Sequence, residues 1–281
     1  MNRQLIVGMP NSGKSTFIAA LRHLLVADEV ETTLMLNGLA AEEEHLNRLE
    51  REWLNLKPVQ RTKPSTEGWV ELNIKNRETD ELSSLLIPDL RGEAFEQPAC
   101  AGQCSPDLYS ALIDASGLLL FTNADRADDA LQIDDLQDIL PSADAAAGDA
   151  PQASPFIPED MPEEVKIVEL LQAINRDRKS ARRRKVAIIV SAWDVVSSND
   201  SRTSPQEWFI KNRPMLAQFL ETNEDKWALR VYGVSAQGGR LPQDQKKLAS
   251  MTPSERVIVV GHGAAVHDLS APLHWLMFEH A

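Results

Sequence analysis

One segment near the N-terminus, Gly8-Met-Pro-Asn-Ser-Gly-Lys-Ser15, limits the possible folds more than any other feature of this chain. The apolar residues 4–8 before it predict a strand, and residues 13–26 predict a helix. Two glycines let the backbone turn tightly, so that amide N–H groups converge on phosphate oxygens at the start of the helix. Lys14 would reach the β- and γ-phosphates of a nucleotide, and Ser15 would bind Mg²⁺. The segment therefore predicts a phosphate-binding loop (P-loop); the alternative is a glycine turn with an exposed lysine.

A second candidate segment begins with apolar residues at 82–87, which predict another strand. That strand leads into Asp89, whose carboxylate can hold magnesium directly or through a water. Gly92 follows three residues later and, having no side chain, can present its N–H to the γ-phosphate. An aspartate at a strand end is often only a turn former. Its position after the P-loop and before a glycine favours the metal-binding role.

Two later segments, Ser191-Ala-Trp-Asp194 and Ser235-Ala-Gln237, each follow an apolar strand. The carboxylate of Asp194 can accept hydrogen bonds from the ring N–H and the exocyclic amine of guanine, a donor pair that adenine lacks. The backbone N–H of Ala236 could bond the guanine carbonyl oxygen. Each segment is a weak signal alone, but their order after the P-loop predicts a guanine site. Its expected residues are Trp193, Asp194, Ser235, Ala236 and Gln237.

Apolar strands alternate with helices along the chain. The expected strands also include residues 69–75, 116–121, 185–190 and 229–234, and the expected helices 40–56, 206–220 and 269–278. Such alternation predicts an α/β fold whose mainly parallel sheet of about six strands is covered by helices on both faces.

The four segments together resemble those of TRAFAC-class GTPases, the group that contains Ras-like and translation-factor GTPases. The loop wording is similar to that of Era/Obg-like members, which carry a Pro-Asn pair there. The stretches Asp89–Phe95 and Asp268–Trp275 resemble the bacterial double-GTPase families, which are encoded in multi-protein operons. The resemblance implies a P-loop three-layer sandwich whose sheet is mixed, mainly parallel with one antiparallel strand. It also implies nucleotide contacts from Asn11, Ser12, Gly13, Lys14, Ser15 and Thr16.

The resemblance further implies a Mg²⁺-dependent molecular switch that hydrolyses GTP to GDP and phosphate. A threonine before a strand would complete the metal site, and we favour Thr62, with Thr66 as the alternative. Charge in the transition state would be stabilised by Arg61, by Arg91 or by a partner. Asn11 matches the asparagine that binds K⁺ in some Era-like GTPases.

The chain departs from the usual pattern at three positions. Ser191 and Ala192 stand where the guanine motif carries asparagine or threonine and then lysine. The lysine stem normally covers the base, so its absence should weaken affinity without removing the selectivity of Asp194. Glu93 stands where Ras-like enzymes carry a catalytic glutamine, and its charge faces the γ-phosphate unfavourably. We therefore expect hydrolysis to be slow or stimulated by a partner.

Charge is distributed unevenly over the 281 residues, whose net charge is -13. Residues 124–164 contain 12 acidic side chains and one basic, and their Pro- and Ala-rich part, 141–162, predicts a flexible insertion. The run 176–185 contains seven basic residues and one acidic residue, and is either a solvated helix end or a docking patch for an acidic partner. The overall acidity and the lack of interleaved aromatic residues argue against a nucleic-acid site.

We expect a single GTPase domain over residues 1–281, with a switch-region insertion at about 27–66 and a C-terminal extension at about 241–281. No apolar run approaches the ~20 residues needed to cross a membrane. Residues 1–8 lack the long apolar segment and the cleavage site of a signal peptide, so we expect none. With only Cys100 and Cys104 the chain has no disulfide framework. These features predict a cytoplasmic protein.

Three functions from different classes are compatible with the sequence. The first is a GTPase switch acting on GTP and on a protein effector or operon-encoded partner. The second is a nucleotide-gated interaction module with little or no hydrolysis. The departures at Glu93 and Ala192 are compatible with this function. The third, a P-loop ATPase or kinase, requires Asp194 and Ser235 to be coincidences.

Overall fold

The computed structural model describes residues 2–38, 43–57, 69–88, 93–125, 157, 161–176 and 182–279. A single sheet of eight strands has the order β2-β3-β4-β1-β5-β6-β7-β8. The strands are β1 (Arg3–Gly8), β2 (Leu34–Leu36), β3 (Val70–Asn76), β4 (Leu82–Ile87), β5 (Gly117–Asn123), β6 (Arg184–Ser191), β7 (Trp227–Ser235) and β8 (Ile258–Val260).

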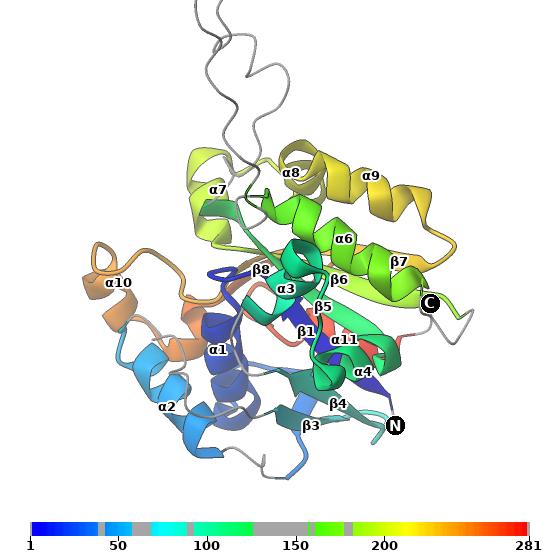
Figure 1. Cartoon of the computed structure of the whole chain (residues 1–281). Coiled ribbons are helices and arrows are strands. Elements are labelled where there is room, and N and C mark those ends of the chain that lie inside the picture. The colour runs from blue at the N-terminus through cyan, green and yellow to red at the C-terminus, as the bar shows by residue number, and fades with distance from the viewer. Residues whose placement is uncertain are drawn as a thin grey trace, which may run out of the picture.

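Helices cover both faces of the sheet (Figure 1). One face carries α1 (Lys14–Ala27), α2 (Glu43–Leu54) and α11 (Ala271–Phe278). The other carries α3 (Glu93–Ala101), α4 (Pro106–Asp114), α6 (Glu163–Arg176), α8 (Pro205–Asn212) and α9 (Pro214–Thr222). The shorter elements are α7 (Trp193–Asn199), α10 (Gln245–Ala249) and the 3₁₀ helix η3 (Pro253–Arg256).

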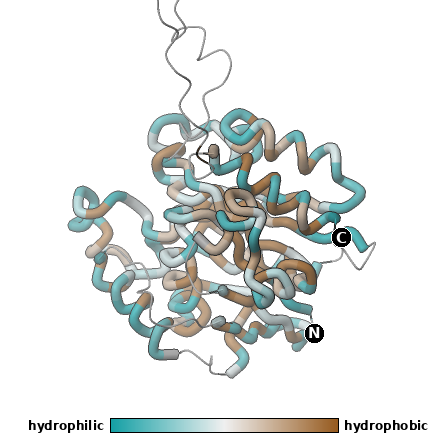
Figure 2. The backbone as a smooth tube through the Cα atoms, in the orientation of Figure 1, coloured by the Kyte–Doolittle hydropathy of each residue, from teal (hydrophilic) through white to brown (hydrophobic). Residues whose placement is uncertain are grey.

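Both faces of the sheet are covered by helices because the apolar residues of its strands point alternately to the two faces. In β1, Ile6 packs in the core below α1, while Leu5 and Val7 pack in the core on the opposite face. Figure 2 shows hydrophobic residues gathered on the sheet and hydrophilic residues on the outer turns of the helices. The predicted three-layer α/β fold is therefore confirmed.

Five strands, β4, β1, β5, β6 and β7, are parallel, so their carboxyl ends meet at one edge. Gly8 pairs with Phe121, and Asn123 pairs with Ser191. The residues that follow each strand are thereby brought together. This edge carries the P-loop.

Three expectations need correction. The sheet has eight strands, not about six, because the short edge strands β2 and β8 were missed. Two strands, β3 and β8, run against the parallel set, where one was expected. The helix expected at 206–220 is two helices, α8 and α9, because Pro214 cannot donate the backbone hydrogen bond that would continue the first one.

The expected C-terminal extension adds to the same sheet. Its strand β8 pairs with β7, and α11 packs in the core that α1 also lines. Most of the acidic insertion at 141–162, namely residues 141–156 and 158–160, lies outside the described residues, and the single-domain organisation stays a prediction. Among the helices described, none has the length and apolar character needed to span a membrane.

Candidate functional site

The loop from Gly8 to Ser15 folds around the side chain of Lys14. Its ammonium donates hydrogen bonds to the carbonyl oxygens of Gly8 and Met9, both at 2.8 Å, and to the Ser12 hydroxyl at 3.1 Å. The side chain is nearly buried, with 5% of the residue exposed. An ammonium has three donors, so the loop's own oxygens hold this cation at its centre.

Helix α1 begins at Lys14, within this segment, and has no side-chain cap. Gly13 precedes it at φ 90°, a left-handed conformation that favours glycine, and the first turn contains no acidic residue. By contrast, Ser105 caps α4 and Ser204 caps α8. The first amide N–H groups of a helix need acceptors and carry partial positive charge. The start of α1 can therefore bind phosphate oxygens.

The P-loop is held by side chains at the carboxyl ends of β5 and β6. At the end of β5 the Asn123 amide donates to the Asn11 carbonyl at 2.9 Å, and at the end of β6 the Ser191 hydroxyl donates to the Ser12 carbonyl at 2.9 Å. A Cβ atom on Gly13 would lie 2.8 Å from the Ser191 side chain. The loop is thus packed tightly onto two strands that are far away in sequence.

The two predicted base-recognition segments lie together at the same edge. The Ser235 hydroxyl donates to Asp194 Oδ1 at 2.5 Å, and the Gly238 amide donates to the Ser235 hydroxyl at 3.1 Å. Because a carboxylate has about four lone pairs, this contact leaves Asp194 able to accept further hydrogen bonds. The tertiary structure brings together a carboxylate and a loop that are 41 residues apart.

The indole of Trp193 is part of the hydrophobic core rather than of the site surface. The residue is 2% exposed and packs in the core beneath α8 and α9. A Cβ atom on Gly233 would lie 2.3 Å from the indole, so only glycine fits on β7 there. The indole therefore positions the segment rather than facing a ligand, and only the backbone of Trp193 remains for nucleotide contact.

Gln237 lies directly after Ala236 in the loop that follows β7. Its side-chain nitrogen is buried and has no hydrogen-bond partner among the described residues. A buried unsatisfied donor costs about 1–3 kcal/mol. An acceptor on a bound ligand would remove that cost.

Several predicted catalytic and metal-binding residues lie outside the described parts of the chain. These are Arg61, Thr62, Thr66, Asp89, Arg91 and Gly92, together with the side chain of Glu93. Strand β4, which leads toward Asp89, ends at Ile87 beside β1, and α3 begins at Glu93. Of the predicted magnesium ligands, only Ser15 is therefore described, on the first turn of α1.

Sequence reasoning missed two supporting residues, Asn123 and Trp53. Asn123 is a polar residue at the end of an apolar run, which is the signal that could have found it. Trp53, in α2, donates its indole N–H to the Ala236 carbonyl at 2.9 Å. No local pattern indicates that contact, because the two residues are 183 positions apart.

Comparison with known proteins gives one family. The family model described as Double-GTPase 1 matches residues 5–276. A search of curated proteins finds no match.

A search of solved structures also found matches at low sequence identity. The S. cerevisiae Ski7 GTPase-like domain bound to GTP is 15% identical over 84% of this chain and 43% of that chain, with a TM-score of 0.43. The signal recognition particle receptor SRb-GTP/SRX complex from Chaetomium thermophilum is 12% identical, with coverages of 89% and 96% and a TM-score of 0.42. The G domain of T. maritima FeoB is 13% identical, with coverages of 88% and 95% and a TM-score of 0.32. The chain thus spans less than half the length of the Ski7 chain.

Proposed function

Because the chain belongs to the Double-GTPase 1 family, we propose that it binds GTP with Mg²⁺ and hydrolyses it to GDP and phosphate as a molecular switch. The observation that carries the proposal is the joint position of the P-loop and the Asp194–Ser235 pair at one edge of the sheet. The groups that we propose for phosphate binding follow β1, and those that we propose for base reading follow β6 and β7 at the same edge.

The P-loop supplies the phosphate half of the site. The uncapped first turn of α1 presents amide N–H groups, and Lys14 adds a positive charge at the centre of the loop. The residues present fit a magnesium ion, because Ser15 offers a hard oxygen donor beside the phosphate position. Asp89 and Thr62 would complete its ligands. Bound magnesium would neutralise charge developing on the phosphate oxygens.

The Asp194–Ser235 pair supplies the base half. Ser235 fixes the orientation of the carboxylate, whose remaining lone pairs would accept from the guanine N1–H and 2-amino groups. The Ala236 N–H would donate to the 6-oxo group, and Gln237 would offer an additional donor. Adenine presents the wrong hydrogen-bonding pattern at both positions, which would leave polar groups of the site unpaired.

Hydrolysis would be slow in the isolated chain. Glu93 could accept a hydrogen bond from the attacking water, although its charge repels the γ-phosphate. Stabilisation of the transition state would fall to Arg61, Arg91, a K⁺ ion held by Asn11, or a partner. The charge at position 93 and the alanine at 192 also favour a second candidate, a nucleotide-gated module without hydrolysis. A multiple-turnover phosphate-release assay separates these two functions.

Base preference is the direct test of GTP binding. Calorimetry should show that GDP and GTP bind at least about tenfold better than ADP and ATP, about 1.4 kcal/mol. Asp194→Asn should remove that preference, because an amide presents a donor where guanine also donates. Asp200→Asn, at the exposed end of the same helix, is the matched control and should leave it intact. Equal binding of GDP and ADP by the unaltered chain would refute the proposal.

The family resemblance also suggests a protein effector or an operon-encoded partner in the cytoplasm. A nucleotide-dependent partner should be retained by the chain loaded with a non-hydrolysable GTP analogue and released by the chain loaded with GDP. Equal retention in both states would argue against a switch.

A further inference from the structure

Helix α2 contacts the loop that is proposed to read guanine. In the sequence this helix is far from that loop, because it follows α1 and precedes the candidate switch segment. Its contact is Trp53, which is fully buried and donates its indole N–H to the Ala236 carbonyl at 2.9 Å. Trp53 belongs to the hydrophobic core below α1, and Ala236 packs against that core. The contact therefore combines burial with one directed hydrogen bond.

Ala236 is restrained on both sides. Before it, the Ser235 hydroxyl bonds Asp194 and accepts from the Gly238 amide. After it, the carbonyl of Ala236 accepts from Trp53. Two anchors around one residue restrict both of its backbone dihedrals, and its N–H lies between them. No other hydrogen bond to the Ala236 carbonyl is found in the described parts of the chain.

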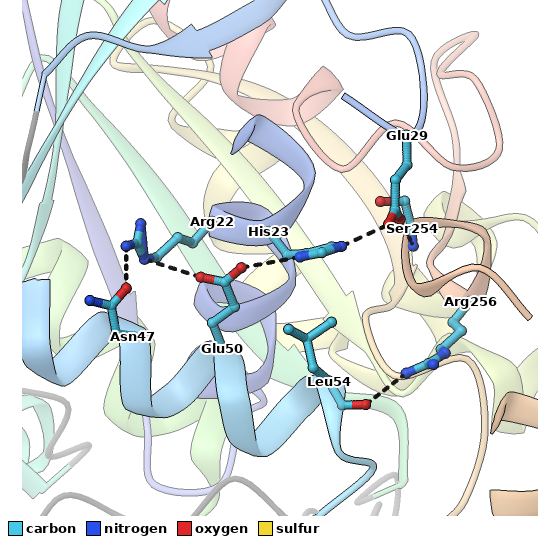
Figure 3. A network of polar contacts seen from close by, with 8 residues as sticks. All are labelled: Arg22, His23, Glu29, Asn47, Glu50, Leu54, Ser254 and Arg256. Atoms are coloured by element: carbon cyan, nitrogen blue, oxygen red, sulfur yellow. Dashed lines mark hydrogen bonds and ion pairs between the residues drawn. The ribbon is translucent and has the colours of Figure 1, made fainter. Parts of the chain in front are cut away.

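Helix α2 is itself held firmly in place (Figure 3). Glu50 of α2 lies between Arg22 and His23 of α1, at 3.3 Å and 3.1 Å. His23 also faces Glu29 at 3.3 Å, and Arg22 donates to Asn47. The hydrogen bond with Glu50 raises the pKa of His23, against the opposing effect of burial. An imidazolium can donate to both carboxylates at once, whereas neutral histidine can donate to only one.

The C-terminal part of the chain also contacts the end of α2 that carries Trp53. Arg256 of η3 donates to the Leu54 carbonyl at 3.4 Å and lies over the Trp53 ring, 5.9 Å from its centroid. The loop of residues 235–238 that is proposed to read guanine, called the base loop below, also packs against η3, because a Cβ atom on Gly238 would lie 2.2 Å from the Arg256 carbonyl oxygen. Trp53 thus lies where α2, η3 and the base loop meet.

We propose that Trp53 is a positioning residue for guanine recognition: its indole N–H fixes Ala236 so that the Ala236 amide faces the 6-oxo group of the base. The inference rests on the proposed function and adds a residue that no base-recognition motif contains.

The test compares Trp53→Phe with Trp227→Phe in the full chain. Trp227 is a matched control because it is 1% exposed, lies on the strand that carries the base loop, and has an indole nitrogen without a partner in the described part of the chain. Both changes remove similar buried area, but only the first removes a hydrogen bond. Affinities for GDP, IDP and ADP are measured by calorimetry, because hypoxanthine shares the 6-oxo group of guanine and adenine does not.

Trp53→Phe should weaken the binding of GDP and of IDP by the same factor, about fivefold, because a neutral hydrogen bond contributes about 1 kcal/mol. ADP affinity should not change, and Trp227→Phe should leave the ratio of GDP to ADP unaltered. An equal loss for all three nucleotides would show a structural role only and would overturn the inference. An unaltered GDP to ADP ratio in Trp53→Phe would overturn it as well.

A second replacement covers the case in which Trp53→Phe does not fold. Site-specific 3-benzothienylalanine at position 53 keeps the shape of the indole and replaces its N–H by sulfur. It should give the same selective loss for GDP and IDP, and unchanged affinities would overturn the inference. If the unaltered chain itself does not prefer GDP to ADP, the proposed function fails, and that outcome is visible before any variant is made.

Discussion

Replacement of Ser191 by alanine tests how the sheet holds the P-loop. The Ser191 hydroxyl donates to the Ser12 carbonyl at 2.9 Å, and both residues are buried. The change removes one hydroxyl and leaves the Ser12 carbonyl without that donor. Since the contact lies on the phosphate side of the site, its loss should affect all nucleotides regardless of base.

The expected magnitude follows from the burial. A neutral hydrogen bond contributes about 1 kcal/mol net, and a buried acceptor left unsatisfied costs about 1–3 kcal/mol. Ser12 is 1% exposed, so water cannot easily replace the lost donor. We therefore expect the free energy of unfolding to fall by about 2 kcal/mol.

Ser84→Ala is the matched control. Ser84 is a fully buried serine on β4 of the same sheet, and its hydroxyl has no partner among the described residues. Its removal deprives no group of a hydrogen bond, so stability should be unchanged or slightly higher. The comparison isolates the hydrogen bond from the general effect of removing a buried hydroxyl.

Urea denaturation measures the stability of both variants, and calorimetry measures their affinities for GDP and ADP. Ser191→Ala should be less stable than Ser84→Ala, and it should bind GDP and ADP more weakly than the unaltered chain, by the same factor for both. Equal stabilities of the two variants would refute the reasoning. A loss confined to GDP would instead place Ser191 in base recognition.

Further predictions concern the charge, metal and pH dependence of the same region. Lys14→Ala should abolish GTP binding, because amides alone compensate the triphosphate charge poorly, and normal calorimetric binding would contradict the P-loop assignment. Ser15→Ala should mainly remove the Mg²⁺-dependent part of the affinity, which titration with and without Mg²⁺ measures. If Asn11 holds K⁺, turnover should be faster in K⁺ than in Na⁺ at equal ionic strength, and Asn11→Ala should erase the difference; identical rates in both salts would exclude this role. The raised pKa of His23 means that the folded chain binds the proton more tightly, so its stabilisation is complete below pH 6.5 and is lost as the pH rises through the folded pKa. Urea midpoints of His23→Gln should therefore fall less steeply with rising pH than those of the unaltered chain, and parallel profiles would contradict the prediction.

Local sequence determined most of the secondary structure and the position of the candidate phosphate site. The glycines of the P-loop allow the tight turn, and its lysine supplies the positive charge. The apolar run before them forms β1. The helical spacing of Leu46, Leu49 and Trp53 correctly predicted the buried face of α2. These features depend on neighbours within a few residues, so a sequence pattern contains them.

The parallel order of the strands was also predictable, and with it the convergence of Asp194 and Ser235. Carboxyl ends of parallel strands share one edge, so two segments that follow such strands must lie near each other. The structure adds the contact itself, a hydrogen bond of 2.5 Å. The short strand β8 was not predictable from its own three residues, because pairing with β7 is what makes them a strand.

Only the tertiary structure decided which side chains support the site from a distance. Asn123 bonds Asn11 across 112 positions, and Trp53 bonds Ala236 across 183. The sequence marks Trp53 as apolar and helical, which accounts for its burial but not for the acceptor of its N–H. A buried indole donor is satisfied by whichever carbonyl the packing of helices and loops brings within reach. That choice depends on the relative placement of α2, η3 and the base loop, and no local pattern contains it.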